Sequence, residues 1–412
     1  MFDSKARSQS RPLAAQRGAA LLVGLLILMT TFALVLAGSI ASSAIQRMRH
    51  DEVTTRALAE AKRGLIAWSV MRNPTDQPSV SARPGDMPCP DMTNLPGSPL
   101  FGTAAATCSP GDLGYFPWRT VGTGPLTDSA GAPLWYAVDG AFKWGLAFGA
   151  HDSKPINSDT VAVLKVKAED GVTDLSSSAI AVIFAPGGAL AGQSRAAGNA
   201  VCGATGGTSR PRQRCADNYL EASTGINNAK NTGPFISGAP SATFNDRLVW
   251  LTVADVMPGV ERRVLTSVKR MLTPGSLPNP AQFNDPDCRD NDTTTTCQSA
   301  PSVCRGILPE LPAMSATWIG RNHWYRLVYY AVGLNAAPNC TAAQTVTGVG
   351  PKQAVLIAMG AARAGQVRGA PYALRNYLDD TANQSGWSGS GPGADVTVPP
   401  SATSNDQMVT IP

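Results

Sequence analysis

The sequence predicts an α+β protein in which a long N-terminal membrane-spanning helix packs on a small antiparallel β-sheet, with a duplicated second unit of helix plus sheet. Three observations lead to this fold class: an uncharged apolar run that continues into an amphipathic stretch, short β-type runs bounded by turn residues, and an internal repeat. The chain is rich in Gly (40) and Pro (32) and only 15% charged, which favours a loop-rich protein over a helical bundle.

The N-terminal helix is predicted from hydrophobic periodicity. No charged residue occurs from Gly18 to Gln46, and residues 19–45 exceed the roughly 20 apolar residues that cross a bilayer. Beyond Arg47, apolar positions recur at three- and four-residue steps until Asn73-Pro74 stops the pattern. We therefore predict one helix over residues 19–72, on the order of 80 Å long, whose membrane-spanning half is 19–45. The basic segment 1–18 predicts a cytoplasmic N-terminus.

The remainder of the chain contains two copies of one pattern. Four segments recur in the same order: 135–138 as 329–332, 181–195 as 354–368, 218–221 as 376–379, and 245–249 as 405–409. The short apolar and β-branched runs within them predict strands. The repeat divides the chain into a first β unit, 73–258, and a second repeat unit, 259–412, which begins with its own helix near Val260.

The eight cysteines predict disulfides. Their number is even, no C-x-x-C occurs, and only three histidines are present, so zinc ligation is poorly supported. Paired cysteines indicate an oxidising compartment. Spacing within the repeat matches Cys89 to Cys288 and Cys108 to Cys304. The hypothesis that follows is the set of pairs Cys89–Cys108, Cys288–Cys304, Cys202–Cys215 and Cys297–Cys340.

Charge and motif content exclude several function classes. Of the formal charge of +5, three units lie in residues 1–18, and no basic stripe for nucleic acid is visible in the rest. Nucleophilic catalysis needs a nucleophile, a base and an orienting group. Ser194 is replaced by Val367 in the second copy, which indicates a structural hydroxyl. We therefore predict that the protein is not an enzyme.

Two sets of polar residues have local interpretations. Arg195 and Arg368 each follow a Gly-containing turn, and we expect them to cap its carbonyl groups. An acidic stretch that includes Asp285, Asp287, Asp290 and Asp292 could offer oxygen ligands to calcium. We expect this acidic stretch to be a solvated loop between cysteines, so we predict no cofactor.

The start of the helix resembles a known family. The segment Arg17-Gly18-Ala19-Ala20-Leu21-Leu22-Val23, after a short basic leader and before the two-part helix, is similar to type IV prepilins. This resemblance implies that a prepilin peptidase cuts after Gly18 and methylates the new N-terminal residue Ala19. It also implies a pilin-like fold and a filament built with other pilin or pseudopilin subunits on an inner membrane assembly platform. Pseudopilins often bind calcium near the sheet, although the acidic stretch of this chain does not match their motif.

The fifth position after the expected cut departs from the family pattern. Most members carry Glu there, whereas this chain has Val23. The resemblance is closest to members without this Glu, which include the tip subunit of type II secretion pseudopili and some minor pilins. The expected function is a minor subunit of a type IV pilus or type II secretion pseudopilus, with the tip as the favoured place. Its expected location is the inner membrane, single pass, with the C-terminal domain periplasmic, before assembly into a cell-surface filament.

An alternative remains open at this point. The chain could be a membrane-anchored periplasmic or cell-surface binding module, adhesin-like, that joins no filament. Trp318, Trp324 and Trp387 could then form a docking face, although tryptophan is more often a core residue. Retention of residues 1–18 would favour this alternative over a filament subunit.

Overall fold

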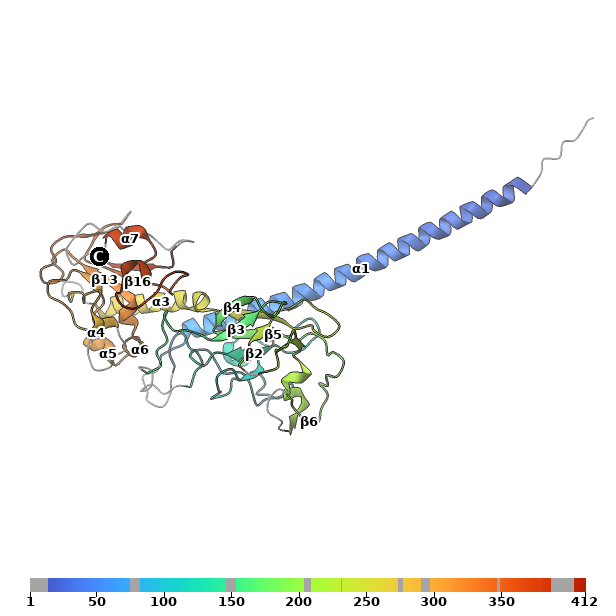
Figure 1. Ribbon diagram of the computed structural model, residues 1–412, viewed down its shortest axis with the longest axis horizontal. Coiled ribbons are helices and arrows are strands. Elements are labelled where there is room, and N and C mark those ends of the chain that lie inside the picture. The colour runs from blue at the N-terminus through green and yellow to red at the C-terminus, as the bar shows by residue number, and fades with distance from the viewer. Residues whose placement is uncertain are drawn as a thin grey trace, which may run out of the picture. The chain divides into compact units, whose positions relative to one another are not determined.

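The computed structural model describes residues 14–74, 82–145, 153–203, 209–230, 232–272, 277–289, 297–346, 349–386 and 404–412 of the 412-residue chain (Figure 1). It divides into two units, Met1–Thr55 and Arg56–Pro412, and each is described by itself. The fold is a mixed α+β arrangement of small sheets with few helices.

The expectation of a membrane-spanning helix is wrong. Helix α1 runs from Ala14 to Met71, but no helix in the described part of the chain contains a stretch that is long and apolar enough to cross a bilayer. The side chains of α1 are described for residues 22–32 and 48–71.

This correction also applies to the expected location. A single-pass inner-membrane protein with a cytoplasmic N-terminus is not supported by the described part of the chain. Most of the predicted leader, residues 1–13, lies outside the described residues. What the structure retains of the expected location is the set of disulfides, which indicates a compartment outside the cytoplasm.

Two four-stranded antiparallel sheets form the framework of the larger unit. The first has the order β1 (Leu113–Tyr115), β2 (Trp135–Val138), β5 (Ala181–Ala185) and β11 (Arg247–Leu251). The second has the order β12 (Arg305–Ile307), β13 (Val328–Val332), β16 (Ala354–Ala358) and β17 (Gln407–Ile411). The repeated sequence segments supply the inner pair of strands and the last strand of each sheet.

The strand registers of the two sheets are equivalent. Val138 pairs with Ala181 in the first sheet, and Val332 pairs with Ala354 at the matching position of the second. Ala185 pairs with Arg247, and Ala358 pairs with Gln407. Every residue of β5 and β16 is buried, which explains why these strands are continuous apolar runs and not alternating ones. The sequence repeat therefore corresponds to a repeated structural unit.

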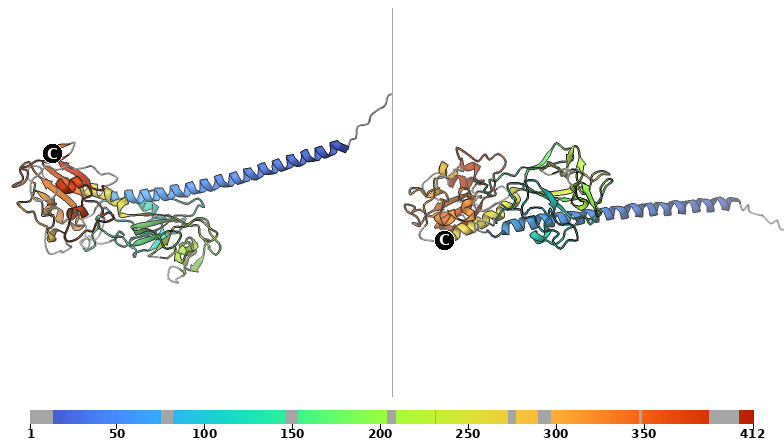
Figure 2. Two further views of the ribbon diagram at one scale, coloured as in Figure 1. Left: turned by 45° about the horizontal axis from the view of Figure 1, so that its top comes forward. Right: turned by 90° about the horizontal axis from the view of Figure 1, so that it is seen from below.

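Each sheet packs against one helix. In the first repeat, the last turns of α1 bury Ala57, Leu58, Ala61 and Leu65. In the second, helix α3 (Val253–Met271) lies beside β16 and β17, as the yellow helix in Figure 2 shows. α3 begins earlier than predicted because Thr252 and Asp255 form a capping box at its N-terminus.

Smaller elements complete the unit. A three-stranded sheet of order β10 (Phe235–Ile236), β3 (Leu164–Lys167) and β4 (Asp174–Ala179) shares a second apolar core with the first four-stranded sheet. Among the described residues, three two-stranded hairpins are present: β6 (Asn199–Val201) with β7 (Ser209–Pro211), β8 (Ala222–Ser223) with β9 (Ile226–Asn227), and β14 (Gln344–Val346) with β15 (Gly350–Lys352). The short helices are α2 (Trp118–Val121), α4 (Pro286–Arg289), α5 (Pro312–Ser315), α6 (Trp318–Arg321) and α7 (Thr381–Gly386).

All eight cysteines are paired, and two of the four predicted pairs are confirmed. Cys89–Cys108 and Cys202–Cys215 form as expected. The predicted pairs Cys288–Cys304 and Cys297–Cys340 are wrong, because Cys288 binds Cys297 and Cys304 binds Cys340.

The error lies in the alignment of the cysteine loops. The isolated bridge between Asp91 and Tyr115 in the first repeat corresponds to that between Ala281 and Ile307 in the second. Counting back two residues from each bridge makes Asn279, and not Cys288, the counterpart of Cys89. The Asn279 side chain lies 3.2 Å from the Cys340 sulfur. Both repeats are thus stapled in the same region, but by cysteines at different positions.

The two repeats contact each other through buried polar groups. Asn322, at the end of α6, accepts hydrogen bonds on its side-chain oxygen from the Arg83 guanidinium and the Ile156 amide, each at 2.8 Å. Its backbone carbonyl accepts a further bond from Asn157 at 2.9 Å. Arg83 is only 1% exposed and is also paired with the buried Asp86 at 3.0 Å. Asn322 is therefore a residue through which the second repeat binds the first.

We predict that Asn322→Ala lowers the free energy of unfolding by about 3 kcal/mol, because the buried Ile156 amide loses its acceptor and the buried Arg83 guanidinium loses one of its acceptors. Chemical denaturation monitored by tryptophan fluorescence measures this change. Asn199→Ala, at an exposed position of β6, is the control and should change stability by less than about 0.5 kcal/mol. Equal effects of the two substitutions would contradict this account of the contact.

Candidate functional site

The first candidate site is the apolar segment of α1, which we define as residues 22–32. Its eight large apolar side chains are 56–69% exposed: Leu22, Val23, Leu25, Leu26, Ile27, Leu28, Met29 and Phe32. At 100° per residue these positions surround most of the helix circumference, and Gly24 and Thr31 occupy the remaining side. An amphipathic helix would expose only one apolar stripe. This segment instead needs an apolar environment on nearly every side.

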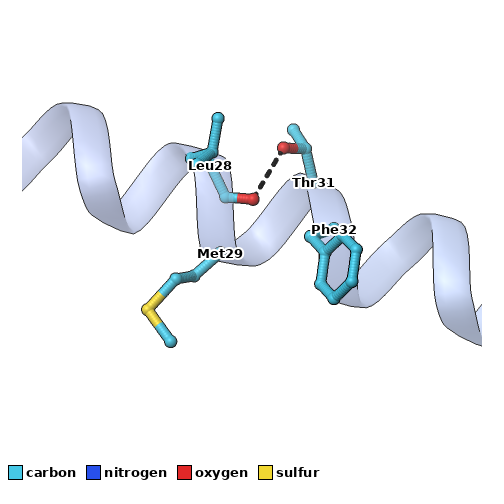
Figure 3. Close-up of a pocket in the computed structure, with 4 residues that line it drawn as sticks. All are labelled: Leu28, Met29, Thr31 and Phe32. Atoms are coloured by element: carbon cyan, nitrogen blue, oxygen red, sulfur yellow. Dashed lines mark hydrogen bonds between the residues drawn. The ribbon is translucent and has the colours of Figure 1, made fainter.

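The polar groups of this segment are satisfied within the helix. The Thr30 hydroxyl donates to the Ile27 carbonyl at 2.9 Å, and the Thr31 hydroxyl donates to the carbonyls of Ile27 at 2.9 Å and Leu28 at 3.0 Å. Figure 3 shows Met29 and Phe32 projecting away from the helix while the Thr31 hydroxyl turns back to the backbone. Threonines bonded in this way need no water, so the segment can enter an apolar contact at little cost.

The residues expected to be processed lie at the start of the same helix. Gly18 and Ala19 fall within the first turns of α1, which begins at Ala14. Val23, at the position where most prepilins carry Glu, is 58% exposed and belongs to the apolar segment.

The second candidate site is a turn cluster that occurs once in each repeat. In the first repeat, Glu221 accepts hydrogen bonds from the Gln193 side chain at 2.7 Å and from the Asn245 amide at 2.9 Å. Asp246 accepts bonds from the Glu221 amide at 2.9 Å and the Asn228 side chain at 3.0 Å. The cluster ties the Gly187 turn, the chain near Glu221 and the start of β11 together.

The second repeat builds the same cluster from equivalent residues. Asp379 accepts hydrogen bonds from the Gln366 side chain and the Asn405 amide, both at 2.8 Å. Asp406 accepts bonds from the Asp379 amide at 3.1 Å and from the Asn383 side chain at 3.4 Å. This cluster stands at the start of β17, as its counterpart stands at the start of β11.

The two arginines that follow the Gly-containing turns cap carbonyl groups, as predicted. Arg195 donates to the carbonyls of Gly187 at 2.8 Å and Asn218 at 2.9 Å, and its guanidinium lies 4.5 Å from the centre of the Tyr219 ring. Arg368 makes the same kind of contacts with Met359, Asn376 and Tyr377. In addition, Arg368 forms an ion pair with Asp159 of the first repeat, which the sequence did not indicate.

The environment of the clusters changes the protonation of their acids. Burial raises the pKa of Asp406 to about 7, and the charge of Asp379 adds to this effect. Burial, followed by the charge of Glu221, also raises the pKa of Asp246 well above its ordinary value. In both aspartates the second carboxyl oxygen is buried without a hydrogen-bond partner. In each cluster, burial therefore favours the protonated form of one aspartate, Asp246 in the first repeat and Asp406 in the second.

Sequence reasoning found the arginines but missed the acid pairs. Glu221 and Asp379 occur at matching places within the repeated segments, as do Gln193 and Gln366. The presence of the same kind of polar residue at the same turn in both copies could have indicated that these side chains take part in a shared contact. It did not reveal that residues about 25 positions apart meet, since that proximity depends on the tertiary fold.

Other sequence-predicted residues do not assemble into a site. Of the four aspartates predicted as calcium ligands, only Asp285 has a described side chain, whereas the side chain of Asp287 and the residues Asp290 and Asp292 lie outside the described part. Within the described part, no group of three His, Cys, Asp or Glu side chains could hold a metal ion. Trp318 and Trp324 are buried, at 7% and 1% exposure, so neither forms a docking face, and Trp387 lies outside the described residues. The Ser194 backbone amide donates to the Asn218 side chain.

Comparison of the chain with protein-family models, with curated protein sequences and with solved structures finds no match.

We predict that Gly187→Ala lowers the free energy of unfolding by about 1–3 kcal/mol, because Gly187 has φ +66° and a Cβ there would lie 2.8 Å from the Asn245 side chain. The adjacent Gly188 has no positive φ, and a Cβ there would extend into open space, so Gly188→Ala is the matched control and should be close to neutral. Thermal unfolding by circular dichroism compares the two. A neutral Gly187→Ala would show that the turn cluster tolerates rearrangement.

Proposed function

We propose that the chain is a minor subunit of a pilin-like filament, of the type IV pilus or type II secretion pseudopilus class, and that it joins the filament through the apolar segment of α1. The observation that supports this most directly is the exposure of eight large apolar side chains around residues 22–32. Contiguous apolar surface of this kind marks an interaction site. Neighbouring helices of like character would cover it on several sides at once.

The energetics of burial favour this mode of assembly. Burying a large apolar side chain contributes about 1.5–3 kcal/mol, so the eight side chains of the segment could contribute roughly 12–24 kcal/mol before costs. Association itself costs an estimated 4–15 kcal/mol. The excess of the burial free energy over the cost of association is largest when partners surround the helix, because a single groove would cover only one face. A packed helical core therefore fits the segment better than a one-sided contact does.

The residue at position 23 supports a place at the tip. In most members of the resembled family a Glu at this position can pair with the terminal amine of a neighbouring subunit. Val23 offers no such charge, and a carboxylate buried without its partner would be costly. A subunit that has no neighbour above it loses nothing by lacking the group. The large disulfide-bonded head, residues 82–412, would also crowd a shaft if it were repeated along it.

We predict that Leu26→Asp lowers the amount of protein recovered with sheared filaments by at least about tenfold, because a carboxylate buried among apolar helices costs several kcal/mol. Immunoblotting of the filament fraction, normalised to total protein, measures the loss. Val172→Asp is the matched control, since Val172 is equally apolar and is 76% exposed on the β3–β4 hairpin. Recovery of Leu26→Asp at the wild-type level would contradict assembly through this segment.

We further predict that protein isolated from cells with an active prepilin peptidase starts at N-methylated Ala19, with residues 1–18 removed. Intact-mass and N-terminal peptide mass spectrometry measure both changes. A Gly18→Lys variant should keep its leader, since the peptidase acts after a glycine in the resembled family. Wild-type protein that starts at Met1 in such cells would refute the pilin-like assignment.

A further inference from the structure

Strand β17 is held at its start by a buried pair of acids. β17 is the last strand in the order β12-β13-β16-β17, so it is bonded to a neighbouring strand on one side only. Asp406 directly precedes it and is 1% exposed, and the Asp379 side chain beside it is 4% exposed. An edge strand has fewer ladder hydrogen bonds than a central one, so its attachment depends more on the contacts of its ends.

The two acids differ in their partners. Both oxygens of Asp379 accept hydrogen bonds, and the Arg363 guanidinium lies 3.6 Å from the Asp379 carboxyl group. One Asp406 oxygen is bonded to the Asp379 amide and to Asn383, and the other is buried without a partner. Two further polar groups lie next to Asp406. The Ser404 hydroxyl accepts a hydrogen bond from the Asp406 backbone amide, and the Asp380 backbone amide faces the Asp406 carboxyl group. No cation among the described residues is paired with Asp406 itself.

The residue after Asp406 connects β17 to the contact between the repeats. The Gln407 side chain donates to Glu261 of α3 at 2.7 Å and to the Pro258 carbonyl at 2.9 Å, and it accepts from Arg262 at 2.8 Å. Glu261 is 1% exposed and in turn accepts a hydrogen bond from Ser158 of the first repeat. Movement at the start of β17 would therefore be transmitted to α3 and to the first repeat.

We propose that Asp406 and Asp379 form a proton-operated latch on β17, which is tight while Asp406 holds a proton and loosens when that proton is lost. With the proton present, the Asp406 carboxyl group that lies in the buried turn beside Asp379 is neutral. Without it, two carboxylates lie together, and one oxygen of Asp406 is charged, buried and unbonded. Opening of the turn returns Asp406 to water and relieves both penalties.

The direction of the pH effect follows from the position of the acid. Asp406 has a raised pKa of about 7 in the closed turn, and the value should return to its ordinary 3.8 when the turn opens. The closed form therefore binds the proton more tightly, and its advantage is complete below about pH 4. It is lost progressively as the pH rises to about 7, by about tenfold per pH unit. Above that value both forms are ionised, and the effect levels off.

Hydrogen–deuterium exchange of the full chain, followed by mass spectrometry, tests the latch. After correction for the intrinsic exchange rate, the amides of β17 should lose about a hundredfold in protection between pH 5 and pH 7, at about tenfold per unit. Asp406→Asn, which cannot ionise, should reduce this loss to less than about tenfold, with Glu261 as the source of the remainder. Asp170→Asn is the matched control, since Asp170 is an exposed aspartate that also accepts turn hydrogen bonds, and it should keep the wild-type response.

Several results would overturn the latch. The first is equal protection of the β17 amides at pH 5 and pH 7 in the wild type. This measurement needs no variant, so it stays decisive even if Asp406→Asn fails to fold. A loss of protection shared equally by β12 and β13 would indicate global destabilisation and not a local opening. Restoration of β17 protection at pH 7 by calcium chloride would show that the acid pair serves a cation. None of these results bears on assembly through the apolar segment of α1, which is tested separately.

Discussion

The burial of one helix face against each four-stranded sheet is the constraint on which the larger unit depends. Every residue of the strands β5 and β16 is buried, so each sheet needs a covering element to keep its apolar side chains out of water. The end of α1 covers the first sheet and α3 covers the second. The two helices are also linked directly, because the Arg263 side chain of α3 donates to the carbonyls of Val70 and Arg72 at the end of α1. Carbonyls at a helix C-terminus have no partner within the helix, so this contact satisfies them.

The polar groups around these helices determine how the repeats are joined. Asn322, Arg83 and Asp86 form one buried contact, and Ser158, Glu261 and Gln407 form another. Each lies between residues of different repeats or between α3 and β17. Buried polar networks are costly when one member is lost, so they restrict the relative position of the elements they join. The duplicated turn clusters then fix the start of the last strand in each sheet, and in the second repeat they make its attachment depend on a proton.

Comparison of expectation and structure separates local patterns from long-range ones. The strands in the repeated segments, the helix that ends near Asn73-Pro74 and the capping roles of Arg195 and Arg368 could be predicted from neighbouring residues. The predicted membrane span is contradicted, since no helix in the described part of the chain is long and apolar enough to cross a bilayer. The predicted cysteine pairs of the second repeat were also wrong, because loops that contain insertions cannot be aligned between the repeats by counting residues. Asn279 occupies the position that corresponds to Cys89, and the residues around it in the sequence do not indicate this.

The sequence by itself determined that the chain has two copies of one helix-and-sheet pattern, that its cysteines pair, and that an apolar segment lies near its N-terminus. These features rest on periodicity, composition and repetition, which act over a few residues at a time. Only the tertiary structure decided that Asp379 meets Asp406, that Glu221 meets Asp246, and that Asn322 enters the first repeat. Such contacts join residues that are about 25 to more than 160 positions apart. Their energies depend on burial and on the partners available in the folded chain, and a linear pattern carries neither.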